Sequence, residues 1–153
     1  MASFNDALDR LVTLALADAT LQAFSQAKWG KALTIERIFK SRVMFSNNVS
    51  TLPFIMLTRP SIEEEYRLSG GRENTHMVRL YGLFLQPDRL KAQEEVIEFE
   101  EKLDDFLVSN YRIKGAGGNP LVQNVYPLRA ANDEGLYHPV YAIVKDVEIV
   151  HRR

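Results

Sequence analysis

Cysteine is absent from this 153-residue chain, which excludes a disulfide framework, a thiolate metal site and a cysteine nucleophile. An excess of one charge is also lacking, because 19 lysines and arginines face 20 aspartates and glutamates. The formal net charge of −1 therefore gives no overall attraction to nucleic acid or to an anionic membrane. No apolar run approaches the roughly 18 residues that a membrane-spanning helix requires. We expect a soluble chain that is made in the cytoplasm and has no membrane partner.

What the chain does have is the composition of an ordinary globular domain, with 46% apolar and 25% charged residues. Its length is close to the roughly 150 residues of one typical domain. A chain of this size buries about 68–70% of its unfolded surface on folding, which is enough for a core without disulfides or metals. We therefore predict a single α+β domain over residues 1–153, and the order of its elements must supply any clue to function.

Two segments have the apolar periodicity of amphipathic helices. In residues 5–27, apolar side chains recur at three- and four-residue spacing. Ser3 or Asn5 can cap the start of this helix, and Gly30 lies near its end. Residues 88–109 show the stronger pattern. Its core-facing positions are Ala92, Val96, Phe99, Leu103 and Phe106.

Other segments are typical of β-strands, because they are rich in β-branched and aromatic residues. The predicted strands are residues 35–45, 52–58, 75–86, 121–128 and 137–150. Loops at 60–71 and 114–120 and a turn at 130–135 connect them. Gly82 indicates a bulge or a close backbone approach, and Pro127 indicates an edge strand. The predicted fold class is α+β, a mostly antiparallel sheet of about four to five strands with two helices packed on one face.

No residue pattern predicts catalysis, a cofactor or a metal. The three histidines, His76, His138 and His151, show none of the i,i+3 or i,i+4 spacing of helical metal ligands. The glycines of residues 114–120 are not followed by the Lys-Ser/Thr of a phosphate-binding loop, and no Gly-x-Ser-x-Gly nucleophile elbow occurs. We expect no enzymatic activity, no cofactor and no metal site.

The helix predicted over residues 88–109 carries a dense run of acids. They are Glu94, Glu95, Glu98, Glu100, Glu101, Asp104 and Asp105. Within that stretch only Lys102 opposes them. Such a run is usually a solvated face, but acids this close repel one another, and a basic partner surface would relieve the repulsion. Both interpretations stay open at this point.

Four segments give the chain an identifiable order of elements. They are Leu52-Pro53-Phe54-Ile55 after a loop, the strand from His76 to Phe84, the acidic helix from Asp88 to Ser109, and a pair of C-terminal strands. Together with the N-terminal helix, this order resembles the tail terminator (tail-completion, minor tail) proteins of long-tailed bacteriophages. The resemblance covers most of the chain and rests on the order of the elements and on their residue character.

The resemblance implies a structural virion protein and not an enzyme. Proteins of that family form a hexameric ring on the last ring of the tail tube, stop tail polymerisation and provide the docking surface for the head connector. The implied partners are further copies of the chain, the tail tube protein and the head–tail connector or stopper protein, while DNA passes through the lumen without specific binding. The implied location is the virion, at the head-proximal end of the tail, after synthesis in the host cytoplasm.

A ring subunit needs two different side surfaces that meet between neighbours. We expect one flank to be acidic and the other basic, because opposite charges steer neighbours into register. The expected interface residues are Glu98, Glu101 and Asp105 on the acidic flank and Arg129, Arg152 and Arg153 on the basic flank. Loops at 61–74 and 114–119 are expected to stay mobile until a partner orders them.

Two other functions are compatible with the same pattern. Another head–tail joining component, a stopper or neck protein, would share the small α+β architecture. An unrelated small-molecule-binding or enzyme subunit would need a concave pocket with convergent polar groups. The residues alone leave all three open.

Overall fold

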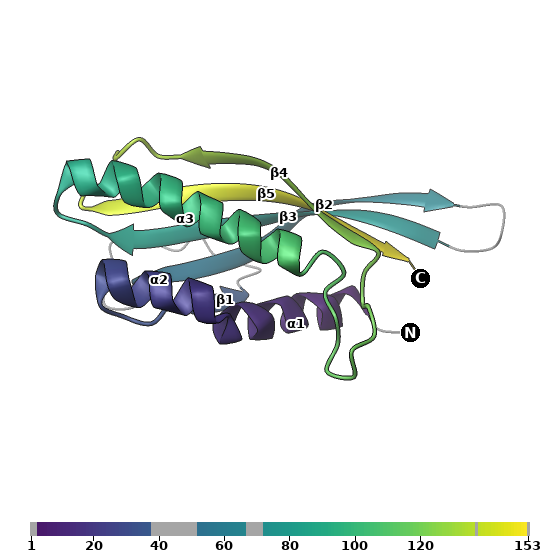
Figure 1. The fold of residues 1–153 in the computed structure, drawn as a ribbon. Helices are drawn as coiled ribbons and strands as arrows, with labels where there is room; N and C mark the ends of the chain where they lie inside the picture. The colour runs from purple at the N-terminus through teal and green to yellow at the C-terminus, as the bar shows by residue number, and fades with distance from the viewer. Residues whose placement is uncertain (1–2, 38–51, 67–71, 137, 153) are drawn as a thin grey trace.

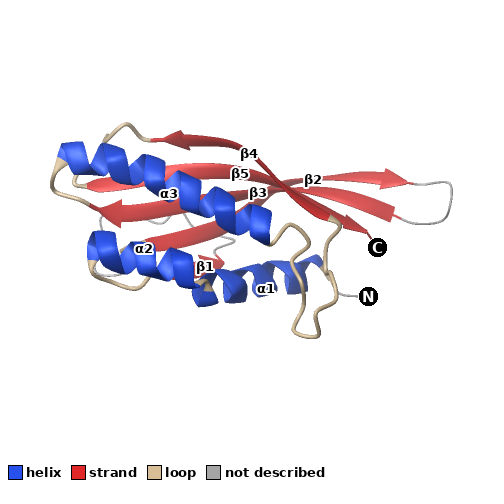
Figure 2. Cartoon of the chain, in the orientation of Figure 1, coloured by secondary structure: helices blue, strands red, loops and turns tan. Residues whose placement is uncertain are grey.

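The computed structural model describes residues 3–37, 52–66, 72–136 and 138–152. The helices in these ranges are α1 (Phe4–Ala17), α2 (Ala19–Trp29) and α3 (Arg89–Ser109), and the strands are β1 (Thr34–Arg37), β2 (Phe54–Tyr66), β3 (Arg72–Leu85), β4 (Asn124–Asn132) and β5 (Val140–Arg152). The strands form one sheet in the order β1-β2-β3-β5-β4, antiparallel except for the β1–β2 pair. The helices pack on one face of this sheet (Figures 1 and 2). The predicted α+β class with a mostly antiparallel sheet is confirmed, with one more helix than expected.

The additional helix arises at Asp18, which divides the helix predicted over residues 5–27. Asp18 has extended backbone angles (φ −70°, ψ 111°) and its carboxylate accepts a hydrogen bond from the Leu21 N–H at 2.8 Å. Aspartate favours such a capping position because its side chain satisfies an N–H at the start of a helix. The ends are as predicted: Ser3 caps α1, and Gly30, in the left-handed region with φ +67°, ends α2.

Strands β2 and β3 continue well past their predicted ends and form a long hairpin. The prediction of a loop over residues 61–74 is wrong, because β2 runs to residue 66 and β3 begins at residue 72. A register shift between Thr58 and Ser61 accommodates Pro60, which has no N–H for the ladder. The paired ends project beyond the helical layer in Figure 1. Residues 67–71 of the predicted loop lie outside the described residues.

The two terminal strands are displaced from their predicted positions by a few residues. β4 extends to Asn132, so the first half of the turn predicted at 130–135 is strand and the second half is the turn. β4 is an edge strand of the sheet, as Pro127 predicted, and its register shifts between Pro127 and Arg129. At the other edge, β1 is short, and the rest of the strand predicted over 35–45 lies outside the described residues.

The main hydrophobic core lies between the helices and the sheet. The five predicted core positions of α3 are all buried there. Phe99 of α3 contacts the rings of Phe24, Trp29 and Phe84 at centroid distances of 5.2–6.2 Å. A β-carbon at Gly82 would lie only 2.6 Å from Phe99 Cε1. Gly82 therefore lets the Phe99 ring of α3 pack directly against the backbone of β3, which is the close approach predicted at this position.

Candidate assembly interface

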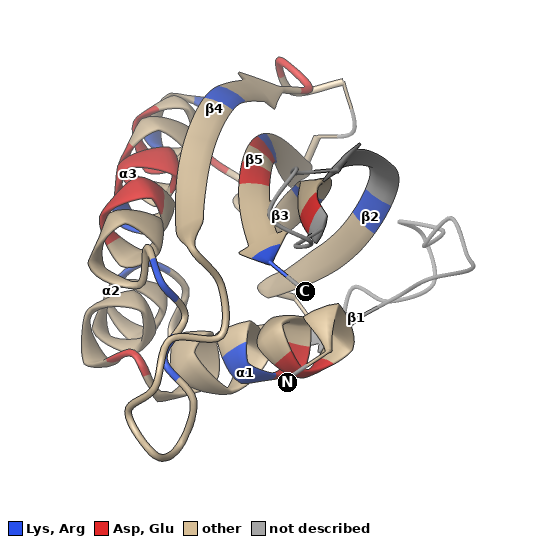
Figure 3. Ribbon diagram, turned by 90° about the vertical axis from the view of Figure 1, so that its right-hand side faces the viewer, with Lys and Arg blue, Asp and Glu red and all other residues tan. Residues whose placement is uncertain are grey.

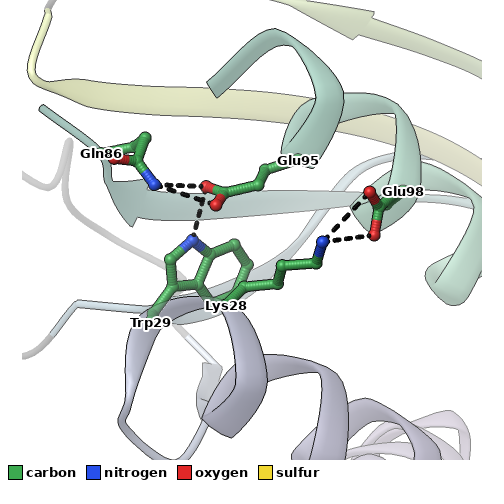
Figure 4. A network of polar contacts seen from close by, with 5 residues as sticks. All are labelled: Lys28, Trp29, Gln86, Glu95 and Glu98. Carbon is green, nitrogen blue, oxygen red and sulfur yellow. Dashed lines mark hydrogen bonds and ion pairs between the residues drawn. The ribbon is translucent and has the colours of Figure 1, made fainter. Parts of the chain in front are cut away.

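Glu95 faces the interior of the molecule, contrary to its predicted place on the outer surface of the acidic helix. It is 5% exposed. The Trp29 Nε1–H donates to its carboxylate at 3.0 Å, and the Gln86 Nε2 donates at 2.9 and 3.1 Å (Figure 4). Its position four residues before Phe99 places it beside the buried stripe. This carboxylate links α2 and the end of β3 to α3 and is not offered to a partner.

Glu98, a predicted interface residue, is engaged within the chain. The Lys28 Nζ on α2 lies 3.0 and 3.2 Å from its two carboxylate oxygens (Figure 4). Both side chains are partly exposed, so the pair contributes little to stability. Its effect is to neutralise one of the acids that the sequence placed on the interacting flank.

A second cation lies beneath α3. Lys145 of β5 is 6% exposed in its side chain and forms an ion pair with Asp104. Glu100 is nearby: burial raises its pKa, the Lys145 charge lowers it, and the Asp104 charge raises it again. The sequence interpretation counted only Lys102 against the acids. It missed Lys28 and Lys145 because both come from other elements and reach α3 only through folding.

The acids that remain are Glu94, Glu101 and Asp105, which are exposed and have no ion pair among the described residues. Glu101 and Asp105 were predicted to be on this flank. Exposed apolar side chains accompany them, with exposed fractions of 69% for Leu90, 58% for Ile97 and 61% for Val108.

At 3.6 residues per turn, positions 90, 94, 97, 101 and 108 fall within about 60° of one another on the helix surface, and position 105 lies beside them. We call this set the outer stripe: Leu90, Glu94, Ile97, Glu101, Asp105 and Val108. Its apolar members were not predicted from the sequence, because they do not belong to the core-facing periodicity. Their spacing of seven and eleven residues does place them on one side of a helix. The outer stripe therefore combines apolar contact area with negative charge.

Arg129, the first predicted basic residue, lies on the sheet face opposite the helices. Its Nε donates to Asp146 at 2.9 Å, and Arg79 Nε donates to the other carboxylate oxygen at 2.7 Å. The hydrogen bond from Arg79 holds the pKa of Asp146 below its usual value, burial opposes this, and Arg129 supports it. The same bond raises the pKa of Arg79. Arg129 is thus partly committed within the chain, although its side chain remains 77% exposed.

The Asp146 pair predicts a pH dependence of stability. Because its pKa is depressed, ionised Asp146 stabilises the fold above the ordinary aspartate pKa of 3.8, and this contribution disappears as the pH falls below that value. We expect Asp146→Asn to lower the free energy of unfolding by about 1.5–3 kcal/mol near neutral pH. Urea denaturation measured from about pH 6 to about pH 2 should show a smaller acid-induced loss in this variant than in the parent.

The exposed Asp105→Asn is the matched control for that experiment, since it removes one acid without an arginine partner. It should leave both the neutral stability and its pH dependence close to the parent. Equal effects of the two substitutions would contradict the assigned role of Asp146.

Arg152, expected on the basic flank, lies at the end of β5, which runs two residues past the predicted strand end at 150. His151 beside it is 2% exposed, so these two residues are held by the strand pairing. Arg153 lies outside the described residues. Arg152 and Arg112, which follows α3, flank a groove of about 570 Å³. We call this the basic groove, lined by Arg112, Pro120, Leu121, Val122, Gln123, His151 and Arg152.

A second groove lies between the first half of α3 and the turn after β4. Its volume is about 540 Å³. Its lining is Arg89, Gln93, Val96, Ile97, Asn132, Glu134, Gly135 and Tyr141. This mixture includes Ile97 of the outer stripe, so the groove is continuous with that surface. Its charged groups are Arg89 and Glu134, which lie beside the apolar side chains of the lining.

Two of the histidines, His76 and His151, lie close together beside Phe4, and the third is placed by a separate contact. His76 stacks on Phe4 with a centroid distance of 3.5 Å, and His151 lies 6.1 Å from His76. His138 is hydrogen bonded through Nδ1 to the Tyr141 hydroxyl at 2.8 Å. Across the described ranges, no group of three or more metal-binding side chains occurs. Within the same ranges no helix has the length and apolarity to cross a membrane.

Comparison with known proteins gives one informative result. No protein-family model and no curated protein matches the chain. Among solved structures, a chain of the "Virion of native gene transfer agent (GTA) particle" is similar over 94% of this chain and 92% of that chain, with a TM-score of 0.58 and 13% sequence identity. The likeness is one of fold. It extends over nearly the whole of both chains, so it concerns the complete arrangement of sheet and helices.

Proposed function

We propose that this chain is a structural subunit of a phage-like virion and has no catalytic role. The observation that carries the proposal is the shared fold with a chain of a gene transfer agent virion, which spans almost the full length of both chains. The fold was also expected from the order of elements along the sequence. Two independent routes, one from the residues and one from the structure, therefore lead to the same class of particle.

Within such a particle, we propose the role of tail terminator. In this role the chain assembles as a ring, hexameric in the proteins it resembles, on the last ring of tail tube protein. The ring stops tail polymerisation and offers its other side to the head–tail connector, at the head-proximal end of the tail. The surfaces of the subunit support this role, because an acidic apolar stripe and a basic groove lie on different parts of the chain, as a heterologous ring contact requires.

Deleting the chain from a particle that contains it tests the role directly. A terminator's absence should give tails of irregular, extended length that fail to join heads, measured by negative-stain electron microscopy. Tails of normal length that fail to join heads would instead identify a stopper or neck protein. Normal tails on normal heads would contradict both roles.

Charge reversal on the outer stripe tests whether that surface takes part in assembly. Replacing Glu94, Glu101 and Asp105 together by lysine should leave the monomer folded, because all three are exposed, and should reduce ring assembly at least tenfold through repulsion from a basic neighbour. Sedimentation velocity and incorporation into tails measure the effect. Reversal of Glu98 is a poor probe, because it would also break the ion pair with Lys28.

A matched control keeps the number of altered acids the same. Other acids such as Asp9, Asp88 and Glu134 are unsuitable for a control because they occupy capping or turn positions or make internal contacts. The control therefore replaces the three acids of the outer stripe by glutamine, which removes their charge without adding positive charge. Its defect should be smaller than that of the lysine variant. If the parent and both variants assemble equally at low and high salt, the outer stripe is a solvated surface that takes no part in assembly.

A further inference from the structure

We propose that the basic groove binds the outer stripe of α3 from a second copy of the chain. This inference rests on the proposed assembly of like subunits and names the contact that joins them. It keeps Arg152 from the basic flank predicted from sequence and puts Arg112 in place of Arg129, because Arg129 is bound to Asp146.

The groove has the properties of a preformed binding site for acidic groups. The Val122 N–H donates to the Arg112 carbonyl at 3.2 Å, and the Gln123 N–H donates to the Val150 carbonyl at 2.8 Å. These backbone bonds tie the connection after α3 to the end of β5. Both arginines are exposed and have no ion pair among the residues that the structure describes.

The dimensions and chemistry of the outer stripe suit this groove. Glu94 and Asp105 are separated by about 16 Å along α3, at 1.5 Å per residue. Glu101 and Asp105 are one turn apart, so their carboxylates can face two arginines at once. The apolar Val108, close to Asp105 on the stripe, would meet Pro120 and the half-buried Leu121 of the groove. Apolar contact surrounded by charged pairs is the usual composition of a specific protein interface.

The two surfaces face different directions, which favours contact between copies over contact within one copy. In Figure 3 acidic segments mark the outer side of α3, while the end of β5 near the C-terminus is basic. No ion pair joins Asp105 to Arg112 in the described residues, although both lie near the end of α3. A contact between two unlike surfaces of the same chain is heterologous, and repetition of such a contact closes a ring or extends a filament.

A charge swap tests the contact. Glu101→Arg and Arg152→Glu should each weaken self-association about tenfold or more, measured by sedimentation velocity on the protein alone and on tail tubes. Both changes in one chain should restore association, because the introduced arginine of one copy would then face the introduced glutamate of the next. Lys31→Glu, which makes the same charge change at an exposed position after α2, is the matched control and should have no effect.

Cross-linking tests the geometry without relying on affinity, and the absence of native cysteine gives it a clean background. A chain with Glu101→Cys and Arg152→Cys should form disulfide-linked multimers on oxidation, and one with Glu101→Cys and Lys31→Cys should not. Failure of both the swap and the cross-link, in a protein that still enters particles and controls tail length, overturns this contact and leaves the proposed function intact. Parent protein that neither associates nor enters particles would contradict the proposed function itself. A different outcome is that the parent binds duplex DNA, with binding abolished by Arg152→Glu and not restored by adding Glu101→Arg. That result would show that the groove binds phosphate, and it would also overturn the contact.

Discussion

Replacing Phe99 by alanine should lower the free energy of unfolding by about 3–5 kcal/mol, the usual cost of emptying an aromatic core position. Phe99 is fully buried and contacts aromatic rings on α2 and β3. Few neighbours can move into the vacated space, because Gly82 below it has no side chain. Equilibrium denaturation in urea, followed by far-UV circular dichroism, measures the change.

A double-mutant cycle with Gly82→Ala makes this prediction specific to the Gly82–Phe99 contact. In the parent, the added methyl group would lie 2.6 Å from Phe99 Cε1 and 2.9 Å from Ile143 Cγ1, so Gly82→Ala alone should cost about 1–3 kcal/mol through overpacking. In the Phe99→Ala background most of that cost should disappear, giving a favourable coupling of about 1 kcal/mol or more. Additive losses would show that Gly82 does not set the distance between α3 and β3.

The second large effect is expected at the ion pair beneath α3. Asp104→Ala should lower the free energy of unfolding by about 2–4 kcal/mol, because it removes the ion-pair partner of the buried Lys145 ammonium. Lys145→Met should change it by less than about 1 kcal/mol. The methionine fills the same apolar site, and Asp104, whose side chain is 41% exposed, can be hydrated by solvent.

The asymmetry between the two variants is the decisive measurement. Asp105→Ala, one position along the same helix and exposed, controls for the removal of an acid and should cost less than about 0.5 kcal/mol. Equal losses for Asp104→Ala and Lys145→Met would mean that the ammonium is solvated and that the pair is an ordinary surface contact.

Much of the fold was predictable because its signals are local. The periodicity of α3, the capping residue Ser3, the glycine that ends α2 and the proline on the edge strand all act within a few residues. The errors occurred where a local signal had two outcomes. Asp18 both permits a helix and caps one, and Pro60 ends a strand unless a bulge accommodates it.

The candidate interface was less predictable, because the availability of a charge depends on long-range partners. Glu98 and Arg129 have the same residue types as Glu101 and Arg152, and only the folded chain brings Lys28 and Asp146 to the first two. Arg112 gave no signal of its own, since the groove it flanks is assembled from three separate segments. The sequence could identify which kinds of charge meet, but not which residues remain free to do so.

The order of the strands also has a consequence for how the chain acquires its structure. β5 lies between β3 and β4, so β3 has a single neighbour until residues 140–152 have been synthesised. The β3–β5 pairing that completes the sheet is therefore non-local, and sheets with such pairings fold more slowly than helical domains of the same size. During that interval the bare edge of β3 is a site for aggregation. Early packing of α3 against β3, through the Phe99–Gly82 contact, would shield the adjoining face before the final strand arrives.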